Sequence, residues 1–427
     1  MAGSSLGRYQ AIFREDAFRW FWLGFTGSAL GDTMTRVAMT WFVYQATGSA
    51  AALGGLLVAY SGPIIVGGLV AGWLLDRYDR RQVMFVDSVV RGIAVSAIPL
   101  LFILGRLQVW HVYVVAAVYG SLMMISLAGG PALVPSLVRR EQLATANALE
   151  SLGFTVSSIV GPLVAGLLIA RFGVALVVTI DAASYFFFAL ALRHVWRLVP
   201  GKPRGPGSAS AGLREAFQLL RGDPILRTTT LMYMGFNFGG GLLYVGLPIL
   251  ASTRLAGGAE LYGVLLGALG AGQLIGAIAA GAVDVSLPLG LLICLTQFLS
   301  GVALLLLPLE ASSAVLVGLS LAFYGLFSAP LTVWAQTLRM SIIPEHVRGR
   351  TFALLRTLMQ GTGPVGGAAA GFILPIVGLL PLLALSGILT GAPGLVGSSV
   401  DKLRQARDQI SGRGDHSPPP TAEASTP

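Results

Sequence analysis

Long apolar stretches alternate with short polar turns along nearly the whole chain. About 20 apolar residues in a helix cross the roughly 30 Å hydrocarbon core of a bilayer, and each stretch reaches that length. An open sheet would leave backbone groups unsatisfied in lipid, so each stretch is predicted to be a helix. The twelve predicted spans are 18–44, 50–75, 82–104, 109–134, 143–170, 173–194, 227–252, 260–283, 286–308, 311–338, 350–375 and 377–397.

Composition agrees with this pattern. Hydrophobic residues make up 55% of the chain and charged residues 11%, against about 25% charged in a soluble globular protein. A net charge of +9 would suggest nucleic acid as the partner of a soluble protein. Here the basic residues lie between apolar runs, where the positive-inside bias of membrane proteins explains them better. We therefore predict a membrane-lipid environment and no nucleic-acid partner.

The basic residues also predict an orientation. The Arg and Lys residues gather on one set of alternate loops and at both termini, whereas the other loops carry only Arg106, Arg171 and Arg254. The arginine-rich side is therefore expected to be cytoplasmic, with both termini on it. The expected location is the inner (plasma) membrane of a bacterium.

A repeat divides the chain into two halves. Pro131 and Pro330 lie about 200 residues apart, and so do two Gly-Pro pairs, Gly161-Pro162 and Gly363-Pro364. Two parallel repeats with a site at their interface are typical of secondary transporters. The predicted fold class is an all-α membrane protein with twelve transmembrane helices in two pseudo-symmetric six-helix bundles. The predicted segments are a cytoplasmic N-terminus (1–17), an N-terminal bundle (18–194), a cytoplasmic linker (195–226), a C-terminal bundle (227–397) and a largely disordered cytoplasmic tail (398–427).

The stretch 67–81, GGLVAGWLLDRYDRR, carries a recognisable motif. It resembles the loop between the second and third helices of the major facilitator superfamily of transporters, roughly G-x-x-x-D-R-x-G-R-R. Asp76, Arg77, Arg80 and Arg81 match, while Asp79 replaces the usual glycine. That variant resembles the drug and siderophore exporter subgroup, with the enterobactin exporter and the macrolide efflux pumps.

The resemblance implies a gate. In the family, the motif aspartate pairs with an arginine and faces the start of the eleventh helix, which latches the cytoplasmic side. The partial positive charge of a helix N-terminus favours an aspartate there, and Arg356 could add a full charge. Asp87 and Arg91, four residues apart, are expected to tie the third helix to this loop, and Glu150 to face Arg139, Arg140 or the motif. The gate candidates are Gly72, Asp76, Arg77, Arg80, Arg81, Asp87, Arg91 and Arg356.

Charges inside the predicted spans need a partner or a function. Asp32 and Arg36 lie one turn apart on the first span. They either cancel each other as an ion pair, or Asp32 binds and releases a proton while Arg36 favours its ionised form. Asp181, inside the sixth span, is a second candidate for protonation. The proton-coupling candidates are Asp32, Arg36 and Asp181.

Two proline sites are predicted to bend helices five and eleven. Gly161, Pro162 and Gly166 resemble the family motif G-P-x-x-G-G, although Ala165 precedes the last glycine. Proline removes one backbone hydrogen bond, while glycine admits a neighbouring helix. A packing kink and a moving gate fit this sequence equally well. The kink candidates are Gly161, Pro162, Gly166, Gly363 and Pro364.

Aromatic and neutral polar residues cluster in spans that are expected to face a central cavity. Aromatic walls suit an amphipathic small molecule, although lipid-facing positions would explain many of these rings as well. The substrate-cavity candidates are Tyr44, Tyr60, Phe236, Asn237, Gln273, Tyr324 and Gln360.

Other chemistry finds little support in the sequence. No G-x-x-x-x-G-K-[ST] phosphate loop is present, the four histidines share no metal-ligand spacing, and the single cysteine, Cys294, cannot form an intrachain disulfide. We expect no enzyme activity, cofactor or metal. We expect a monomeric proton antiporter that exports small amphipathic compounds by alternating access. The family's fourth-span arginine is missing, so the coupling residues must lie elsewhere. An importer, a siderophore-specific exporter, a lipid translocase and a non-transporting sensor remain alternatives.

Overall fold

The computed structural model describes residues 11–198, 213–282, 287–344 and 347–406, and they are helical apart from short turns. Helices of 20 to 32 residues follow the predicted spans, and the predicted ends lie within four residues of the observed ones (338 against 342 at most). These helices are α2 (Asp16–Thr47), α3 (Ala50–Arg77), α4 (Arg80–Ile103), α5 (Val109–Leu133), α6 (Leu143–Phe172), α7 (Val174–Leu198), α9 (Pro224–Thr253), α10 (Gly258–Ala282), α11 (Leu289–Glu310), α12 (Ala314–Ile342), α13 (Arg348–Val377) and α14 (Leu379–Ser398).

Four short elements complete the part of the chain that the structure describes. They are η1 (Val134–Ser136), η2 (Arg140–Gln142), α8 (Leu213–Gly222) and α15 (Asp401–Arg404). The middle of the predicted linker (199–212) and most of the predicted tail (407–427) lie outside the described residues. α8 lies within the predicted linker.

Nine of the described helices are long and apolar enough to cross a membrane by length and hydropathy alone. The remaining long helices are α2, α3 and α13. α2 carries Asp32 and Arg36 in its interior, which lowers its mean hydropathy. Buried charges are not confined to these three helices, because α4 carries Asp87 and Arg91 and α7 carries Asp181.

The chain turns between helices with residues suited to helix ends. Side chains of Ser49, Asp79 and Asp223 accept hydrogen bonds from the first backbone N–H groups of α3, α4 and α9. Gly173 and Gly378 end α6 and α13 with φ of +80° and +84°, a region that favours glycine. These two tight turns hold equivalent places in the two halves, which supports the predicted internal repeat.

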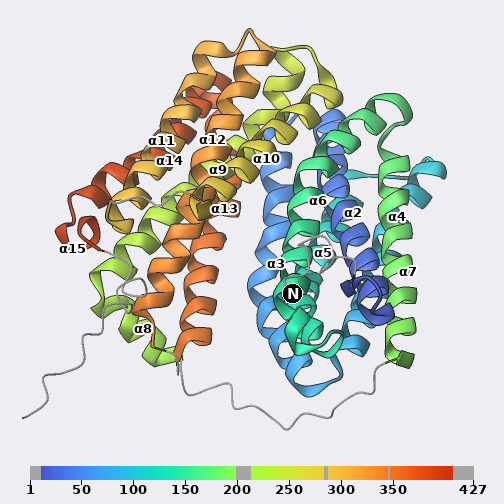
Figure 1. Cartoon of the computed structure of the whole chain (residues 1–427). Coiled ribbons are helices and arrows are strands. Elements are labelled where there is room, and N and C mark those ends of the chain that lie inside the picture. The colour runs from blue at the N-terminus through green and yellow to red at the C-terminus, as the bar shows by residue number, and fades with distance from the viewer. Residues whose placement is uncertain (1–10, 199–212, 283–286, 345–346, 407–427) are drawn as a thin grey trace, which may run out of the picture.

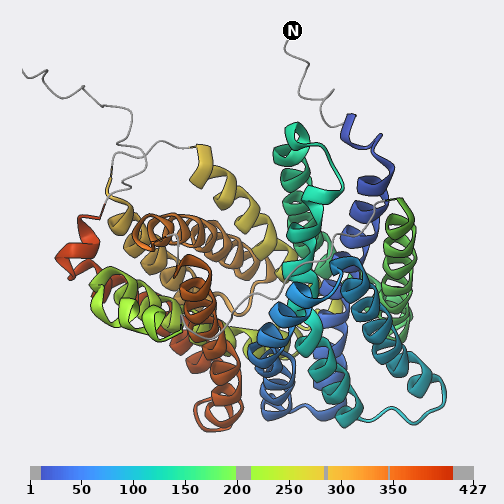
Figure 2. The same cartoon turned by 90° about the horizontal axis from the view of Figure 1, so that it is seen from below.

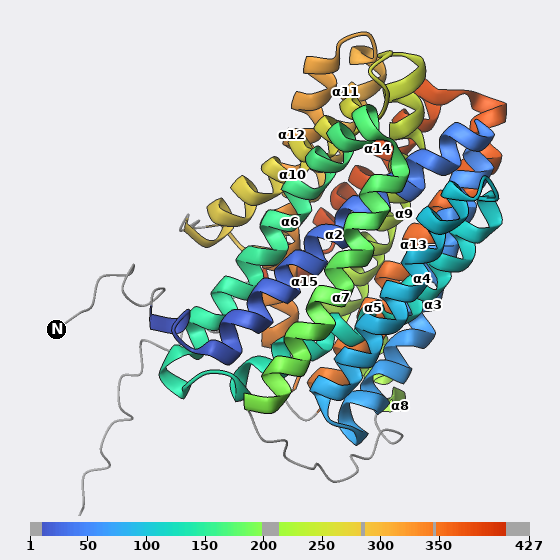
Figure 3. The ribbon, with the colours of Figure 1, turned by 90° about the vertical axis from the view of Figure 1, so that its right-hand side faces the viewer.

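The helices form two bundles that lie side by side (Figure 1). The N-terminal bundle comprises α2 to α7 and the C-terminal bundle comprises α9 to α14, and a view from below separates them clearly (Figure 2). Figure 3 shows α6, α2 and α7 next to one another on the side of the N-terminal bundle. We call the membrane face at the α3–α4 turn (77–80) the basic face, and the face at Gly48 and Gly173 the opposite face.

Glycines join the two bundles along two seams. In the first, Gly54 and Gly371 bring α3 and α13 together; in the second, Gly166 and Gly263 do the same for α6 and α10. A Cβ added at Gly263 would lie 2.9 Å from the Gly166 Cα, so the backbones are in direct contact. Both seams lie in the halves of these helices nearer the opposite face. The bundles diverge toward the basic face (Figure 1).

Candidate functional site

A buried arginine in α4 connects four helices of the N-terminal bundle. Arg91 is 1% exposed and pairs with Asp87 through two nitrogens, with Nε 3.0 Å from Asp87 Oδ1. Its Nη1 donates to the Tyr185 hydroxyl at 3.1 Å, and its Nη2 donates to Ser126 Oγ. The same Nη1 lies 3.8 Å from a carboxylate oxygen of Asp32. Arg91 is therefore the centre of a polar cluster of Asp32, Asp87, Arg91, Ser126, Asp181 and Tyr185.

Asp32 is the carboxylate of this cluster that lines a cavity. Its Oδ1 accepts a hydrogen bond from the Tyr185 hydroxyl, and its side chain is 25% exposed. Asp32, Arg91 and Ser126 line a cavity of about 40 Å³ together with Phe25 and Phe154. A cavity of about 10–15 Å³ can already hold a water molecule. Water can therefore reach the Asp32 carboxylate.

Asp181 is the most enclosed carboxylate of the cluster. It is 0% exposed, and its Oδ1 accepts from Ser184 Oγ at 3.3 Å. Its Oδ2 has no hydrogen-bond partner among the described residues. Gly31 of α2 leaves room for this side chain, since an added Cβ would collide with it. A buried carboxylate with one unsatisfied oxygen is costly when ionised.

The cluster contains more acids than bases. Asp32, Asp87 and Asp181 oppose the single Arg91, and Asp87 already occupies two nitrogens of its guanidinium. Two unit charges 4 Å apart interact by about 4 kcal/mol at an effective dielectric of 20. The arrangement therefore favours a proton on at least one carboxylate.

Arg36 does not pair with Asp32, although the two residues are one helical turn apart. The expected Asp32–Arg36 ion pair is wrong, because Asp32 turns to Arg91 and Tyr185. The Arg36 side chain is exposed, and within the described residues its guanidinium has neither an ion pair nor a hydrogen bond. Its electrostatic neighbours are Tyr60, Tyr119, Tyr244 and Tyr262, from α3, α5, α9 and α10. Arg36 thus lies where the two bundles meet.

Asp87 and Arg91 also differ from expectation. They were predicted to tie the third helix to the basic loop, but they pair with Asp32, Ser126 and Tyr185 instead. The physical reason is that both are buried in the bundle, where each charge needs its nearest polar partner. Glu150 likewise lies against Gly130 of α5.

The basic loop is ordered by its own residues. Asp79 accepts from the Arg81 backbone at 2.9 Å and from Arg81 Nε at 3.0 Å. Arg80 donates to the Ala132 carbonyl of α5, and the Arg77 guanidinium lies 5.5 Å from the centre of the Trp73 ring. Arg139 pairs with Glu15 at 3.2 Å. These contacts fix the loop against the N-terminal bundle.

The remaining gate candidates are not brought together. The Asp76 side chain lies outside the described residues. Arg356 is exposed on α13, and a Cβ added at Gly72 would meet nothing within 4 Å. The latch therefore stays a prediction.

The predicted kink sites lie inside continuous helices. Pro162 is within α6 and Pro364 within α13. Gly161 packs on Thr33 of α2, and Gly166 packs on Gly263 across the seam. The carbonyl of Gly363 packs against Gly241 of α9. Close helix contact explains these glycines, and any movement at the prolines stays a prediction.

The aromatic substrate-cavity candidates lie in three separate places. Tyr60 stacks on Tyr119 at 5.0 Å near Arg36, and Tyr44 packs on Trp41 at 5.7 Å toward the opposite face. Phe236 stacks on Tyr324 at 5.8 Å in the C-terminal bundle. The Asn237 amide donates to the Tyr233 carbonyl at 3.0 Å, whereas Gln273 and Gln360 are exposed.

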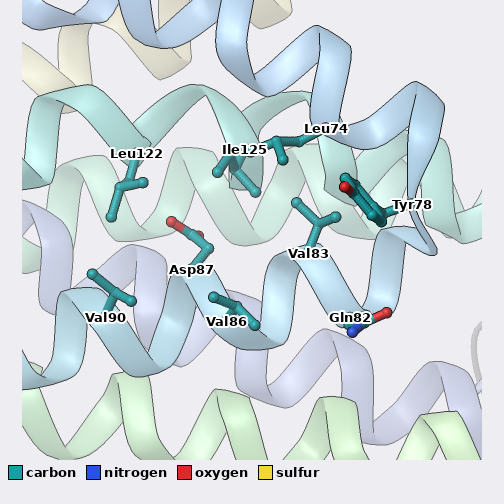
Figure 4. A pocket seen from close by; sticks show the side chains of 9 residues that line it. All are labelled: Leu74, Tyr78, Gln82, Val83, Val86, Asp87, Val90, Leu122 and Ile125. Carbon is teal, nitrogen blue, oxygen red and sulfur yellow. The ribbon is translucent and has the colours of Figure 1, made fainter.

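A pocket in the N-terminal bundle lies away from Arg36. It measures about 220 Å³ between α3, α4 and α5, and its lining is apolar apart from Tyr78, Gln82 and Asp87 (Figure 4). Val86 and Val90 on its wall are exposed. The Asp87 carboxylate already pairs with Arg91 and Ser126, so this pocket offers no free charge to a ligand.

Sequence reasoning missed several members of the site. Tyr185 bridges Arg91 and Asp32. Tyr244, by contrast, lies on an aromatic-rich span that was expected to face the cavity, and it bonds Thr40 across the bundle interface at 2.6 Å. Tyr185 follows Asp181 by four residues, so the shared helix face was a usable signal. Arg339 was also missed: it is 3% exposed, donates to the Thr229 carbonyl at 3.0 Å and lies 5.1 Å from the Tyr233 ring centre.

Comparison with known proteins gives a consistent result. Residues 9–425 match the family model described as transmembrane secretion effector, of the major facilitator (MFS) type. The MFS-type transporter YfiS of Bacillus subtilis (strain 168) is 26% identical over 400 residues, covering 90% of this chain and 92% of YfiS. The enterobactin exporter EntS of Salmonella choleraesuis (strain SC-B67) is 28% identical over 389 residues, covering 86% of this chain and 92% of EntS.

Solved structures share the fold. A bacterial homologue of the human lysosomal transporter Spinster, inward-facing and unoccupied, has a TM-score of 0.61 at 18% identity and covers 94% of this chain and 99% of its own. A POT family transporter in complex with a thioalcohol-conjugated peptide has a TM-score of 0.69 at 13% identity, covering 90% and 96%.

Proposed function

Because this chain belongs to the transmembrane secretion effector family of major facilitator transporters, we propose that it exports small amphipathic compounds by proton antiport. The family makes it a multi-pass membrane transporter and not an enzyme. Export is supported by the 28% identity to an enterobactin exporter. Drug-like molecules and siderophores are the substrate classes that this relationship favours.

The observation that carries the coupling proposal is the excess of acid around Arg91. Asp32 has water access, shares Arg91 with Asp87, and accepts from Tyr185. A carboxylate that competes for one arginine can change its protonation when the bundles move. We assign Asp32 the role of proton carrier and Asp181 that of a second, enclosed protonation site.

The arrangement of the bundles supports an inward-facing state. If the basic face is cytoplasmic, as the distribution of Arg and Lys predicts, the seams at Gly54 and Gly166 close the outer side. The bundles diverge toward the cytoplasm (Figure 1). In the opposite state, the loop motif and Asp76 would hold the basic face shut against the start of α13.

The proposal is tested by accumulation of fluorescent amphipathic dyes in cells with and without the protein. Expressing cells should hold several-fold less dye, and a protonophore should restore the dye level. Asp32→Asn should remove the pH dependence of efflux, while Asp401→Asn, exposed on α15, serves as the control. Efflux that persists without a proton gradient, or an unaltered pH profile in Asp32→Asn, would contradict proton antiport through Asp32.

A further inference from the structure

Arg36 is a charge in the middle of the membrane for which the described part of the chain supplies no counter-charge. It lies 20 residues into α2, counting from Asp16, and its side chain is exposed. Among the described residues no carboxylate pairs with it, since Asp32 is held by Arg91 and Tyr185. An arginine at this depth is costly unless it has a partner. The exposed guanidinium is therefore available to an anionic ligand.

The surroundings of Arg36 are aromatic and drawn from both bundles. Tyr60 and Tyr119 of the N-terminal bundle stack on each other, and Tyr262 of the C-terminal bundle stacks on Trp41 of α2. These three tyrosines and Tyr244 of the C-terminal bundle interact electrostatically with Arg36. Thr40, one turn along α2, donates its hydroxyl proton to the Arg36 carbonyl at 2.8 Å and therefore accepts from the Tyr244 hydroxyl at 2.6 Å. This bond holds α9 of the C-terminal bundle against α2, one turn from Arg36. A ligand at Arg36 would contact both moving parts.

These side chains select for a particular chemistry. A guanidinium offers five N–H donors in a fixed fork and no acceptor, which suits a carboxylate or a similar planar anion. Tyrosine rings offer flat apolar surface and hydroxyls that can donate to the same anion. A cation would instead be repelled by Arg36.

We infer that the transported compound is an aromatic anion whose negative group pairs with Arg36 between the tyrosines. This inference rests on the proposed export function and adds the charge of the substrate. Binding of the anion neutralises Arg36, which lets the interface close around it. Outward movement of a negative charge is also downhill in a cell whose interior is negative.

Two dyes with the same xanthene ring and opposite charge test the inference. The full chain in lipid nanodiscs is titrated with carboxyfluorescein, an anion, and with rhodamine 123, a cation, and binding is followed by fluorescence anisotropy. Wild type should bind carboxyfluorescein at least tenfold more tightly than rhodamine 123. Arg36→Gln should lose that preference, Arg36→Lys should retain part of it, and Arg106→Gln, exposed in the α4–α5 turn, should leave it unchanged.

The inference is overturned if wild type prefers rhodamine 123, if it binds neither dye, or if Arg36→Gln binds carboxyfluorescein as tightly as wild type. Circular dichroism and size-exclusion chromatography of each variant show that it is folded. Because binding is measured without a proton gradient, the preference for one dye does not depend on whether transport is coupled to protons. A wild-type protein that shows no charge preference but retains proton-dependent efflux would refute the inference alone, whereas efflux without proton dependence would refute the proposed function alone.

Discussion

At the residue scale, the site is organised by unequal access to one positive charge. Asp87 is tightly bound to Arg91, Asp32 is more distant at 3.8 Å, and Asp181 is enclosed with an oxygen left unpaired among the described residues. Three chemically identical side chains therefore have three different environments. That difference is what would allow one of them to exchange a proton while another only maintains structure.

Arg91 is predicted to be structurally essential. Arg91→Gln leaves the buried Asp87 carboxylate without its partner, and breaking such a pair costs about 3 to 5 kcal/mol. The apparent melting temperature of the purified protein in detergent should fall sharply. The double variant Asp87→Asn with Arg91→Gln removes both charges and should recover much of the loss. A single variant as stable as wild type would show that the pair is not needed for folding.

Asp79 gives a prediction about pH. Hydrogen bonds from Arg81 lower the pKa of the Asp79 carboxyl below its ordinary value, against a smaller effect of partial burial. A lowered pKa stabilises the fold above the ordinary value of about 3.9, and the stabilisation is lost as pH falls through the lowered pKa.

Asp79→Asn keeps an N-cap side chain but loses the charge. It should melt at a lower temperature than wild type at pH 7, and the gap should close in scans below pH 4. A gap that stays constant across this pH range would mean that the charge of Asp79 contributes nothing.

At the element scale, helix positions were predictable and helix pairing was not. Apolar length and turn residues such as Ser49, Gly173 and Gly378 are local signals, so the predicted ends agree with the structure to within a few residues. The Arg91–Asp32 contact joins residues 59 positions apart on helices whose rotation the sequence does not specify. The i, i+4 rule correctly paired Asp87 with Arg91 but failed for Asp32 and Arg36, because a stronger partner was available on another helix.

The glycine seam between α6 and α10 is predicted to be intolerant of side chains. In Gly263→Ala the new methyl group would lie 2.9 Å from the Gly166 Cα, so the helices must separate. Spin labels at Arg171→Cys and Glu260→Cys, both exposed on the opposite face, should then report a longer distance, and efflux should fall several-fold.

Gly27→Ala is the matched control for this substitution, because nothing lies within 4 Å of its added Cβ. Cys294 is buried and contributes little background labelling. An unchanged distance in Gly263→Ala would show that the seam can absorb a methyl group.

At the scale of the whole molecule, the two bundles are expected to alternate between closure at one face and closure at the other. The family resemblance assigns the basic-face closure to Asp76. Asp76→Asn should therefore leave the melting temperature nearly unchanged but reduce efflux at least fivefold.

Labels at Gln82→Cys and Met340→Cys, exposed on α4 and α12, would follow this closure directly. In wild type a fraction of molecules should show a short distance between them, and Asp76→Asn should deplete that fraction. Normal efflux by Asp76→Asn, or an unaltered distance distribution, would count against the latch.

The seams of bare backbone have an evolutionary consequence. In one seam the backbones of Gly166 and Gly263 meet directly, and in the other Gly54 packs on the backbone of Gly367. The two seams that close the opposite face therefore use none of the side chains proposed to bind a ligand. Arg36 can then be exchanged without altering these seams, whereas Tyr244 also bonds Thr40 across the bundle interface. A transporter built in this way can acquire a new cargo by changing a handful of positions, while its mechanics are inherited intact.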